Sequence, residues 1–523
     1  MWRAWFLGVI AALTLEAGCG EWADKLACGD QGCDWTDEEW ARVQSLAHVT
    51  NTPPPPDPSN AYLPIVDWRT RALAPNAAQD LDGTLAPEPW TLPEVTLGWR
   101  LYHDTALSGS PSDVDTLGLP APTSRTSTCG QIGVSCATCH DPKRFGADFT
   151  SVPNTVSIGA GWYDVNGQQT LNAARYPVLY WNGRTDVLWA QAAQVMESPV
   201  SMNGHRMKTF WVVMQPTYWP AYAAIFADAP AVQELAARLV PPATGAATGV
   251  YKAAYEALAP ADQATVTRVH VNVAKAIAAY EWLLSSDGSP FDAYAAGVAG
   301  AEAAFPPAAE RGLKLFIGRA SCIDCHSTPL FSDGKFHDIG IPQTGAHVPT
   351  IAACVTAKCD CVAEAGTSAA CLPLGAFAGQ EKLATQAFRR GTAYDDNFAA
   401  NPGVVPAPAP VVPDPRWLGA WRTPSLRDVA MTGPYMHDGL FATLGDVVWH
   451  YDQGGGEGST SGTSELSPLH LTAQDRDDLV AFLETLTGIP GPPDLIEPPP
   501  ATVLVGAPAA CPVAASVAFE GAP

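Results

Sequence analysis

Two short motifs carry the residues with the most specific chemistry in the chain. Both have the spacing Cys-x-x-Cys-His, and their residues are Cys136, Cys139 and His140 in the first copy and Cys322, Cys325 and His326 in the second. Two thiols one helical turn apart can form thioethers with the two vinyl groups of a haem, and the following His then directs its imidazole at the iron. A Cys-x-x-Cys pair alone also occurs in disulfides and in half of a zinc site, but a His follows both copies, which makes a shared zinc site a poor fit. The sequence therefore predicts two covalently attached haem c groups, with His140 and His326 as proximal iron ligands.

Helical patterns dominate the segments that must position these motifs. Thr36 to Glu39 has the composition of a capping box, and apolar residues recur at helical spacing in several later segments. The expected helices cover residues 36–48, 93–102, 261–284, 310–316 and 472–486. Strand signals are few, so the sequence predicts a mainly α fold with long connections.

Composition and charge limit the function classes. The chain has 523 residues, of which 47% are hydrophobic and 16% charged; this is enough apolar surface for more than one core and excludes wholesale disorder. It has 29 Lys and Arg against 53 Asp and Glu, a net charge of −24, and such a surface repels the phosphates of a nucleic acid. We therefore expect no nucleic-acid partner.

The first 18 residues are typical of an export signal. Arg3 is followed by an apolar run from Trp5 to Leu15, which is too short to span a bilayer, and by small residues before Cys19. This ending resembles a bacterial lipoprotein signal with a lipidated Cys19, although Glu16 stands where that signal has an aliphatic residue. We expect a periplasmic or cell-envelope protein that reaches the membrane only through a lipid anchor at Cys19, and the sequence leaves that anchor open.

The surroundings of both motifs resemble the bacterial di-haem cytochrome c peroxidase and MauG family. The segments that carry the resemblance are YWNGR at 180–184, FSDGKFHD at 331–338, RTPSLR at 422–427, GPYMHDG at 433–439 and a closing helix at 472–488. The resemblance covers about residues 97–488 and implies two cytochrome c-like helical domains, each with one haem c. It places a peroxidatic haem in the first domain and an electron-transfer haem in the second.

The resemblance also implies roles for residues outside the two motifs. Trp181 becomes the electron relay between the haems, although a core aromatic is the simpler reading of one Trp among 17. Gln191 falls on a position of the family's distal pocket. The positions whose oxygens hold a calcium ion between the domains are Asn166, Thr432 and Pro434, and oxygen ligands that include backbone carbonyls suit Ca²⁺.

Three positions depart from the peroxidase pattern. Ala160 stands where peroxidases have a His that caps the peroxidatic iron, and a methyl group cannot ligate iron, so the first haem should keep an open distal position. Tyr451 stands where they have a Met on the second haem, as in MauG-type enzymes, and this harder ligand stabilises oxidised iron. Here the alternative is a packed Tyr451 with His450 or Met436 as the ligand.

The third departure is Ser201, which replaces the family's acid–base Glu. Cleavage of peroxide needs a group that takes a proton from one oxygen and delivers it to the other, and a Ser hydroxyl is a poor base near neutral pH. Glu197 and His205 are near enough in sequence to substitute, or they are surface residues. Efficient peroxide turnover is therefore in doubt.

The cysteines outside the haem motifs suggest disulfides. Removing the four haem cysteines and Cys19 from the 13 leaves eight, an even number, and oxidation is permitted after export. Cys28 and Cys33 can bridge locally. The others are Cys354, Cys359, Cys361 and Cys371 in an inserted loop, with Cys129 and Cys511 elsewhere. We prefer disulfides to a metal cluster in the insertion because no His pattern accompanies it.

These observations give a domain plan and a function. The plan is an export signal (1–18), an N-terminal extension with a Pro-rich linker (19–90), a first haem domain (91–295), a second haem domain (296–489) with an inserted loop (340–415), and a loose Pro- and Ala-rich tail (490–523). We expect an exported di-haem oxidoreductase that reduces hydrogen peroxide, or reacts with O₂, with electrons from a donor cytochrome c or another small redox protein. The alternatives are a MauG-like oxidase or oxygenase acting on an organic or protein substrate, and a di-haem electron carrier without catalysis.

Overall fold

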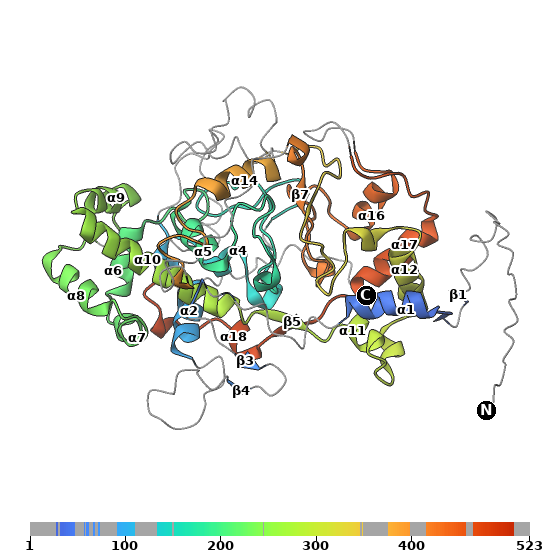
Figure 1. Ribbon diagram of the computed structural model, residues 1–523, viewed down its shortest axis with the longest axis horizontal. Helices are drawn as coiled ribbons and strands as arrows, with labels where there is room; N and C mark the ends of the chain where they lie inside the picture. The colour runs from blue at the N-terminus through green and yellow to red at the C-terminus, as the bar shows by residue number, and fades with distance from the viewer. Residues whose placement is uncertain are drawn as a thin grey trace, which may run out of the picture.

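The computed structural model places the helices of the chain in two groups joined by a loop-rich region (Figure 1). It describes residues 28–29, 32–47, 57, 59–61, 66–67, 72–73, 92–109, 133–148, 151–243, 245–345, 348, 375–397, 415–456 and 464–506. The mainly α fold expected from the sequence is confirmed. Among the described residues, no helix is both long and apolar enough to cross a membrane.

The first group packs around one long, buried helix. It contains α2 (Pro93–His103), α5 (Leu188–Glu197), α6 (Arg206–Val213), α7 (Trp219–Ile225), α8 (Ala229–Arg238), α9 (Thr248–Glu256) and α10 (Pro260–Glu281). α10 is buried almost all round from Val266 onward and contacts α2, α5 and α6. Gly98 on α2 lets the two backbones cross closely, because a Cβ there would lie 1.9 Å from the carbonyl oxygen of Ala276.

The second group repeats this arrangement. It contains α1 (Asp37–Leu46), α11 (Pro290–Ala295), α12 (Pro307–Ile317), α16 (Leu444–Asp452) and α17 (Ala473–Glu484). α12 crosses α17 at Gly312, where a Cβ would lie 1.9 Å from the carbonyl oxygen of Asp478. The capping box of Thr36 and Glu39 is present at the start of α1, whose buried Val43 and Leu46 belong to this second core.

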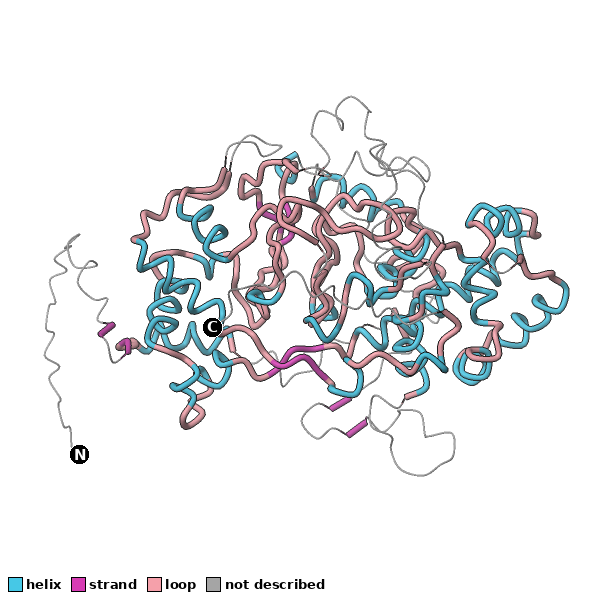
Figure 2. The backbone as a smooth tube through the Cα atoms, turned by 180° about the vertical axis from the view of Figure 1, so that it is seen from behind, coloured by secondary structure: helices cyan, strands magenta, loops and turns pink. Residues whose placement is uncertain are grey.

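The remaining elements are short. The further helices are α4 (Cys136–Cys139), α14 (Ala376–Thr385) and α18 (Pro493–Ile496), with 3₁₀ turns η2 (Thr105–Leu107), η3 (Pro142–Arg144), η4 (Ala173–Arg175), η5 (Ala301–Ala304), η6 (Cys322–Asp324), η8 (Pro415–Trp417), η9 (Val429–Met431) and η10 (Ala501–Val503). The strands form antiparallel pairs: β1 (Cys28–Gly29) with β2 (Gly32–Cys33), β3 (Val66–Asp67) with β4 (Ala72–Leu73), β5 (Ser285–Asp287) with β8 (Ile489–Gly491), and β6 (Phe336–His337) with β7 (Trp421–Arg422). The β5–β8 pair lies at the edge between the two helix groups (Figure 2).

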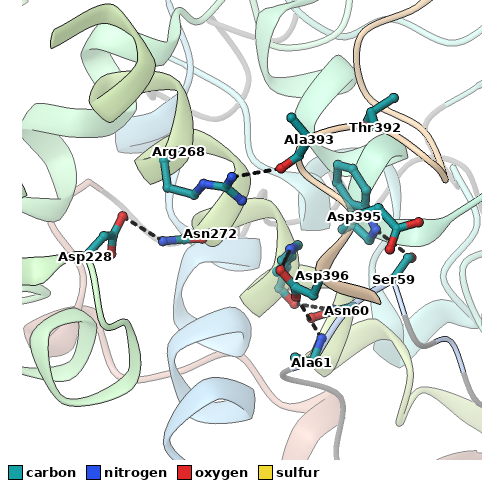
Figure 3. A network of polar contacts seen from close by, with 12 residues as sticks. Ser59, Asn60, Ala61, Asp228, Arg268, Asn272, Thr392, Ala393, Asp395 and Asp396 are labelled. Carbon is teal, nitrogen blue, oxygen red and sulfur yellow. Dashed lines mark hydrogen bonds and ion pairs between the residues drawn. The ribbon is translucent and has the colours of Figure 1, made fainter. Parts of the chain in front are cut away.

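Part of the expected inserted loop folds onto the first group. Besides α14, residues 389–397 meet the N-terminal segment 59–61 over α10 (Figure 3). Lys275 of α10 has no exposed side-chain surface and pairs with Asp396 at 2.5 Å. The Asp396 carboxylate also accepts from the backbone N–H of Ala61 at 2.9 Å, and its own N–H donates to Ser59. The other part of the insertion lies outside the described residues.

The expectation of a loose tail is wrong for residues 490–506. Leu495 is buried in the first core, and its carbonyl oxygen accepts from the Tyr280 hydroxyl at 2.8 Å. The backbone N–H groups of Val505 and Gly506 both donate to the Asp104 carboxylate at 2.7 Å. Asp104 is fully buried and needs such donors, which explains why this Pro-rich segment is held.

The domain boundaries stay a prediction. The hydrophobic cores divide near residue 290, but α1 from the N-terminal extension joins the second core, and Phe388 from the insertion joins the first. The export signal, Cys19 and residues 507–523 lie outside the described residues.

Candidate haem sites

The first Cys-x-x-Cys-His motif forms a single capped helical turn. α4 begins after Ser135, whose backbone N–H donates to the Thr138 hydroxyl at 2.9 Å. Cys136 and Cys139 therefore lie one turn apart, and neither is in a disulfide. The His140 N–H donates to the Cys136 carbonyl at 2.9 Å, while the Nδ1 of its ring lies 3.2 Å from the Gly146 carbonyl oxygen. A proton on Nδ1 leaves the lone pair on Nε2, the tautomer that binds iron.

The second motif has the same geometry in a 3₁₀ turn. The N–H of His326 donates to the carbonyl of Cys322 at 2.8 Å, and its Nδ1 lies 2.8 Å from the carbonyl oxygen of Phe331. Cys322 and Cys325 are outside disulfides. Burial lowers the pKa of His326, so its imidazole is neutral as a ligand must be. Both motifs thus fit a covalent haem in the orientation of their thiols and in the tautomer of their His.

Two departures from the peroxidase pattern meet on one wall near the first motif. The Ala160 N–H donates to the carbonyl oxygen of Ser201 at 2.8 Å. The Cys139 thiol contacts the carbonyl of Ile158 at 3.6 Å, which places this wall beside the haem-attachment residues. Ala160 is buried, and the Ser201 hydroxyl bonds to Ser198 at 3.0 Å. The wall therefore presents a methyl group and a hydroxyl rather than an imidazole and a carboxylate.

Gln191 lies on α5, the helix that leads into this wall. Its carbonyl oxygen accepts from the Tyr180 hydroxyl at 3.4 Å. The Arg184 guanidinium stacks 3.5 Å from the Tyr180 ring centroid and donates to the Tyr163 hydroxyl. Gln191 is therefore tied to the YWNGR segment, and no sequence pattern indicated Tyr163 as part of this cluster.

Glu197 is neither a free base nor a surface residue. It accepts two hydrogen bonds from the Arg206 guanidinium, at 2.8 and 2.6 Å, and one from the Arg206 backbone at 2.9 Å. Burial alone would raise the pKa of this carboxyl, but His270 and Arg206 lower it to about 2. The Nδ1 of His205 accepts from the Met207 N–H at 3.1 Å and caps α6. The geometry therefore argues against Glu197 as a replacement for the missing carboxylate, and gives His205 a structural use.

Tyr451 lies on α16, beside the second motif. Burial raises the pKa of its phenol, and the thiols of Cys322 and Cys325 lie close enough to raise it further. His450, the alternative ligand, points its Nε2 at the carbonyl oxygen of Ile339 at 2.8 Å. The second ligand of the second haem stays a prediction at Tyr451, and the bond to Ile339 gives His450 a structural use.

The interdomain residues converge around Asn166. The Trp181 indole N–H donates to the carbonyl of Asn166 at 2.8 Å, and the Asn166 side-chain amide donates to the carbonyl of Pro434 at 2.8 Å. The Ser157 hydroxyl donates to Asn166 Oδ1 at 3.0 Å. The Thr432 hydroxyl bonds to its own turn at 3.2 Å, so the ligand expected at this position is its backbone carbonyl.

Two interface residues have no role in the sequence-based interpretation. The ring of His437 stacks on that of Trp421, with centroids 3.9 Å apart and planes 16° apart. The His437 ring also lies edge to face with the Trp181 ring, with centroids 6.4 Å apart. His437 was visible in the GPYMHDG segment, but only the fold brings Trp421 to it.

One expected disulfide has structural support. Cys33 is disulfide-bonded, and the β1–β2 pairing places the backbone of Cys28 opposite it. The remaining candidates, Cys129, Cys354, Cys359, Cys361, Cys371 and Cys511, lie outside the described residues.

Comparisons with known proteins identify the family that the chain resembles. The family model for di-haem cytochrome c peroxidase matches residues 93–300. The cytochrome-c peroxidase IdrP1 of Denitromonas iodatirespirans is 30% identical over 404 residues, which cover 77% of this chain and 83% of that protein. The methylamine utilization protein MauG of Methylorubrum extorquens is 30% identical over 403 residues, covering 77% and 80%. The solved structure of the diheme peroxidase BthA from Burkholderia thailandensis has 22% identity and a TM-score of 0.48, covering 84% of this chain and 95% of that one.

Proposed function

This chain belongs to the di-haem cytochrome c peroxidase and MauG family, and we propose that it reduces hydrogen peroxide at a first haem with electrons that reach it through a second. The observation that carries the proposal is the pair of Cys-x-x-Cys-His turns, each with its His ring oriented by a backbone carbonyl. Haem iron supplies one-electron redox chemistry and a binding position for a peroxide oxygen. In this proposal Cys136, Cys139 and His140 hold the first haem, and Cys322, Cys325 and His326 hold the second.

Ala160 supports an open position at the first haem. Its side chain cannot coordinate iron. Ala160 is buried, and its backbone N–H holds it beside the Ser198–Met202 turn through the hydrogen bond to Ser201. Peroxide or O₂ then needs no prior loss of a protein ligand. Ser201 can hold a bound oxygen by hydrogen bonding but does not take up its proton near neutral pH, so we expect slow peroxide turnover.

Tyr451 supports a second haem of low reduction potential. A phenolate oxygen is a harder ligand than a thioether and stabilises oxidised iron. The net charge of −24 suits a basic electron donor such as a small cytochrome c. Trp181, held between the two halves by Asn166, is the proposed relay.

A calcium ion between the halves is part of the proposal. The carbonyl of Pro434 accepts from the side-chain amide of Asn166. Rotating this side-chain amide by 180° would place Oδ1 where Nδ2 now lies, so that both residues present an oxygen. In the same loop, Asp438 Oδ2 is buried and finds no hydrogen-bond partner among the described residues. Burial raises the pKa of Asp438 to about 7, and a nearby cation would satisfy this carboxylate.

We also propose a cell-envelope location. The apolar run before Cys19 and the disulfide of Cys33 support it, since disulfides persist in oxidising compartments. Attachment through a lipid on Cys19 is part of the same proposal and rests on sequence alone.

A MauG-like oxidase is the second candidate. The combination of Ala160, Ser201 and Tyr451 favours it, because an open first haem without a carboxylate base suits slow oxidation of an organic or protein substrate better than rapid peroxide removal.

Spectroscopy and rapid kinetics test the proposal together. The purified ferric protein should contain two haem c groups per chain, one high-spin and one low-spin by electron paramagnetic resonance. Mixing the reduced protein with peroxide should oxidise both haems, and a reduced cytochrome c should sustain turnover. A first haem that is fully low-spin with two strong axial ligands would overturn the open site, and no turnover at millimolar peroxide would remove the peroxidase in favour of the oxidase.

A further inference from the structure

We propose that Trp421 is a second electron-relay residue, coupled to Trp181 through the ring of His437. The inference rests on the proposed di-haem function and extends it, because sequence resemblance points to a relay at Trp181 only. Trp421 then connects the Trp181 relay to the second haem site.

The three rings form one contiguous aromatic path. Trp421 and His437 are stacked, with centroids 3.9 Å apart and an angle of 16° between their planes. His437 and Trp181 meet edge to face at 6.4 Å and 70°. They come from three separate segments, and the side chains of Trp421 and His437 are both buried.

Backbone hydrogen bonds hold this path in place. The Arg422 N–H donates to the carbonyl of Trp181 at 2.7 Å, which ties the two Trp-bearing segments together. The Asn166 N–H donates to the carbonyl of His437 at 2.6 Å, and the Asn166 carbonyl accepts from the Trp181 indole. Rings fixed on both sides need little rearrangement when an electron moves.

The path reaches both haem-attachment sites. At one end, Trp181 is bonded to Asn166, and a Cβ on the adjacent Gly167 would lie 3.5 Å from the His140 ring. At the other end, Trp421 lies directly opposite His337 in the β6–β7 pair.

The turn before β6 continues to the second motif. His337 bonds through Nε2 to Asp333 at 3.1 Å, and the Asp333 N–H donates to the carbonyl of Cys325 at 2.8 Å. The three-ring path is therefore connected to the first motif through Asn166 and to the second motif through His337 and Asp333.

The environment of His437 suits a bridging ring. The His437 side chain is buried beside both indoles. Gln343 lies with its Nε2 2.6 Å from the His437 Nε2 and helps to hold the ring nearly parallel to that of Trp421. An imidazole is harder to oxidise than an indole, so His437 connects the indoles and is not itself oxidised.

The electrons balance through two one-electron steps. Trp181 gives one electron toward the first site and is then reduced by Trp421. The second site, reduced by the donor, returns an electron to Trp421. Two such transfers, with two protons from solvent, reduce one hydrogen peroxide to two molecules of water. Neither Trp is changed at the end of a cycle.

Flash-quench photo-oxidation tests the path without peroxide. A ruthenium-diimine photosensitiser, oxidised in a laser flash by an external quencher, takes an electron from the ferric holoprotein and supplies the oxidising strength that indole oxidation needs. Absorbance differences then follow electron exchange between the two haems. Trp421→Phe should slow the exchange about tenfold, equivalent to about 1.4 kcal/mol of added barrier. Trp421→Tyr keeps an oxidisable ring and should fall between Trp421→Phe and the parent protein, a recovery that a packing role alone would not give.

Trp417→Phe is the matched control. Trp417 belongs to the same segment, but its ring lies outside the three-ring path, with its centroid 6.2 Å from that of Phe336. Exchange between the haems in Trp417→Phe should therefore be as fast as in the parent protein. An unchanged rate in Trp421→Phe beside a slowed rate in Trp181→Phe would overturn the proposal. Equal slowing by Trp417→Phe and Trp421→Phe would also overturn it. Peroxide takes no part in this experiment. A parent protein without peroxidase activity would therefore contradict the proposed function, but it would not affect the measured rate of exchange between the haems.

Discussion

The backbone N–H of Ala160 donates to the carbonyl oxygen of Ser201 across 2.8 Å, so the two positions that distinguish the first haem site from a peroxidase are neighbours on one wall. A His at 160 and a Glu at 201 would be two large polar groups at the same place. With Ala and Ser there, the wall offers space and one hydroxyl. The two expected departures, a side chain that cannot ligate iron at 160 and a hydroxyl in place of a base at 201, therefore belong to one surface, and each can be tested separately.

Ser201→Glu should restore a base to this wall. We expect the second-order rate of reaction with peroxide to rise about 100-fold, the lower end of the usual contribution of general acid–base catalysis. Stopped-flow absorbance of the ferric protein measures this rate. Ser201→Gln has nearly the same size without a base and should leave the rate within about threefold of the parent value. An equal rise in both variants would mean that side-chain size, and not proton transfer, limits the reaction.

Tyr451→Phe should remove the sixth ligand of the second haem. The ferric spectrum of that haem should change from six- to five-coordinate, and Tyr451→Met should raise its reduction potential because a thioether favours reduced iron. His450→Gln is the control, since it can still donate to Ile339 in place of the His450 Nε2 and should leave the spectrum unchanged. A ferric spectrum that changes in His450→Gln and stays the same in Tyr451→Phe would identify His450 as the ligand.

Calcium should stabilise the junction between the two halves. After treatment with a chelator, added Ca²⁺ should raise the melting temperature progressively with the logarithm of its free concentration above the dissociation constant. Asn166→Ala removes a predicted ligand and should abolish this Ca²⁺-dependent rise, whatever its own effect on stability. Ser157→Ala loses only the hydroxyl bonded to Asn166 Oδ1 and should keep the rise. A response that survives Asn166→Ala would place the ion elsewhere.

The sequence predicted the parts of the molecule that depend on local spacing. The two haem motifs, the capping box at Thr36 and the helix at 261–284 are local patterns, and the described helices match them closely. Contacts between distant segments were not predictable in this way. The capture of residues 505–506 by Asp104 and the stacking of Trp421 on His437 depend on which segments the fold brings together.

Glu197 shows the same limit within the site. Its nearness in sequence to Ser201 suggested a substitute base, but Arg206, nine residues later, returns to form a bidentate pair with it. No spacing rule distinguishes a Glu that faces a haem from one that faces an Arg. Only the turn between α5 and α6 decides between them.

Replacement of Glu197 should therefore affect stability and its pH dependence more than chemistry. The pKa of Glu197 is lowered from 4.5 to about 2 by His270 and Arg206 against the effect of burial. A carboxyl with a lowered pKa in the folded state contributes stability that is complete above its unfolded value and is lost as the pH falls toward its folded value. The shift corresponds to about 3 kcal/mol at neutral pH.

Denaturant unfolding of Glu197→Gln at several pH values checks this expectation. At pH 7 the variant should be about 2 to 3 kcal/mol less stable than the parent, and the difference should shrink steadily as the pH is lowered from about 5 to about 2. Its peroxide rate at pH 7 should stay near the parent value, because the carboxylate is engaged by Arg206 and not by the haem site. The exposed pair of Arg238 and Asp262 provides the comparison: Asp262→Asn should change stability by less than about 1 kcal/mol. A large fall in peroxide rate with no loss of stability in Glu197→Gln would return Glu197 to the role of catalytic base.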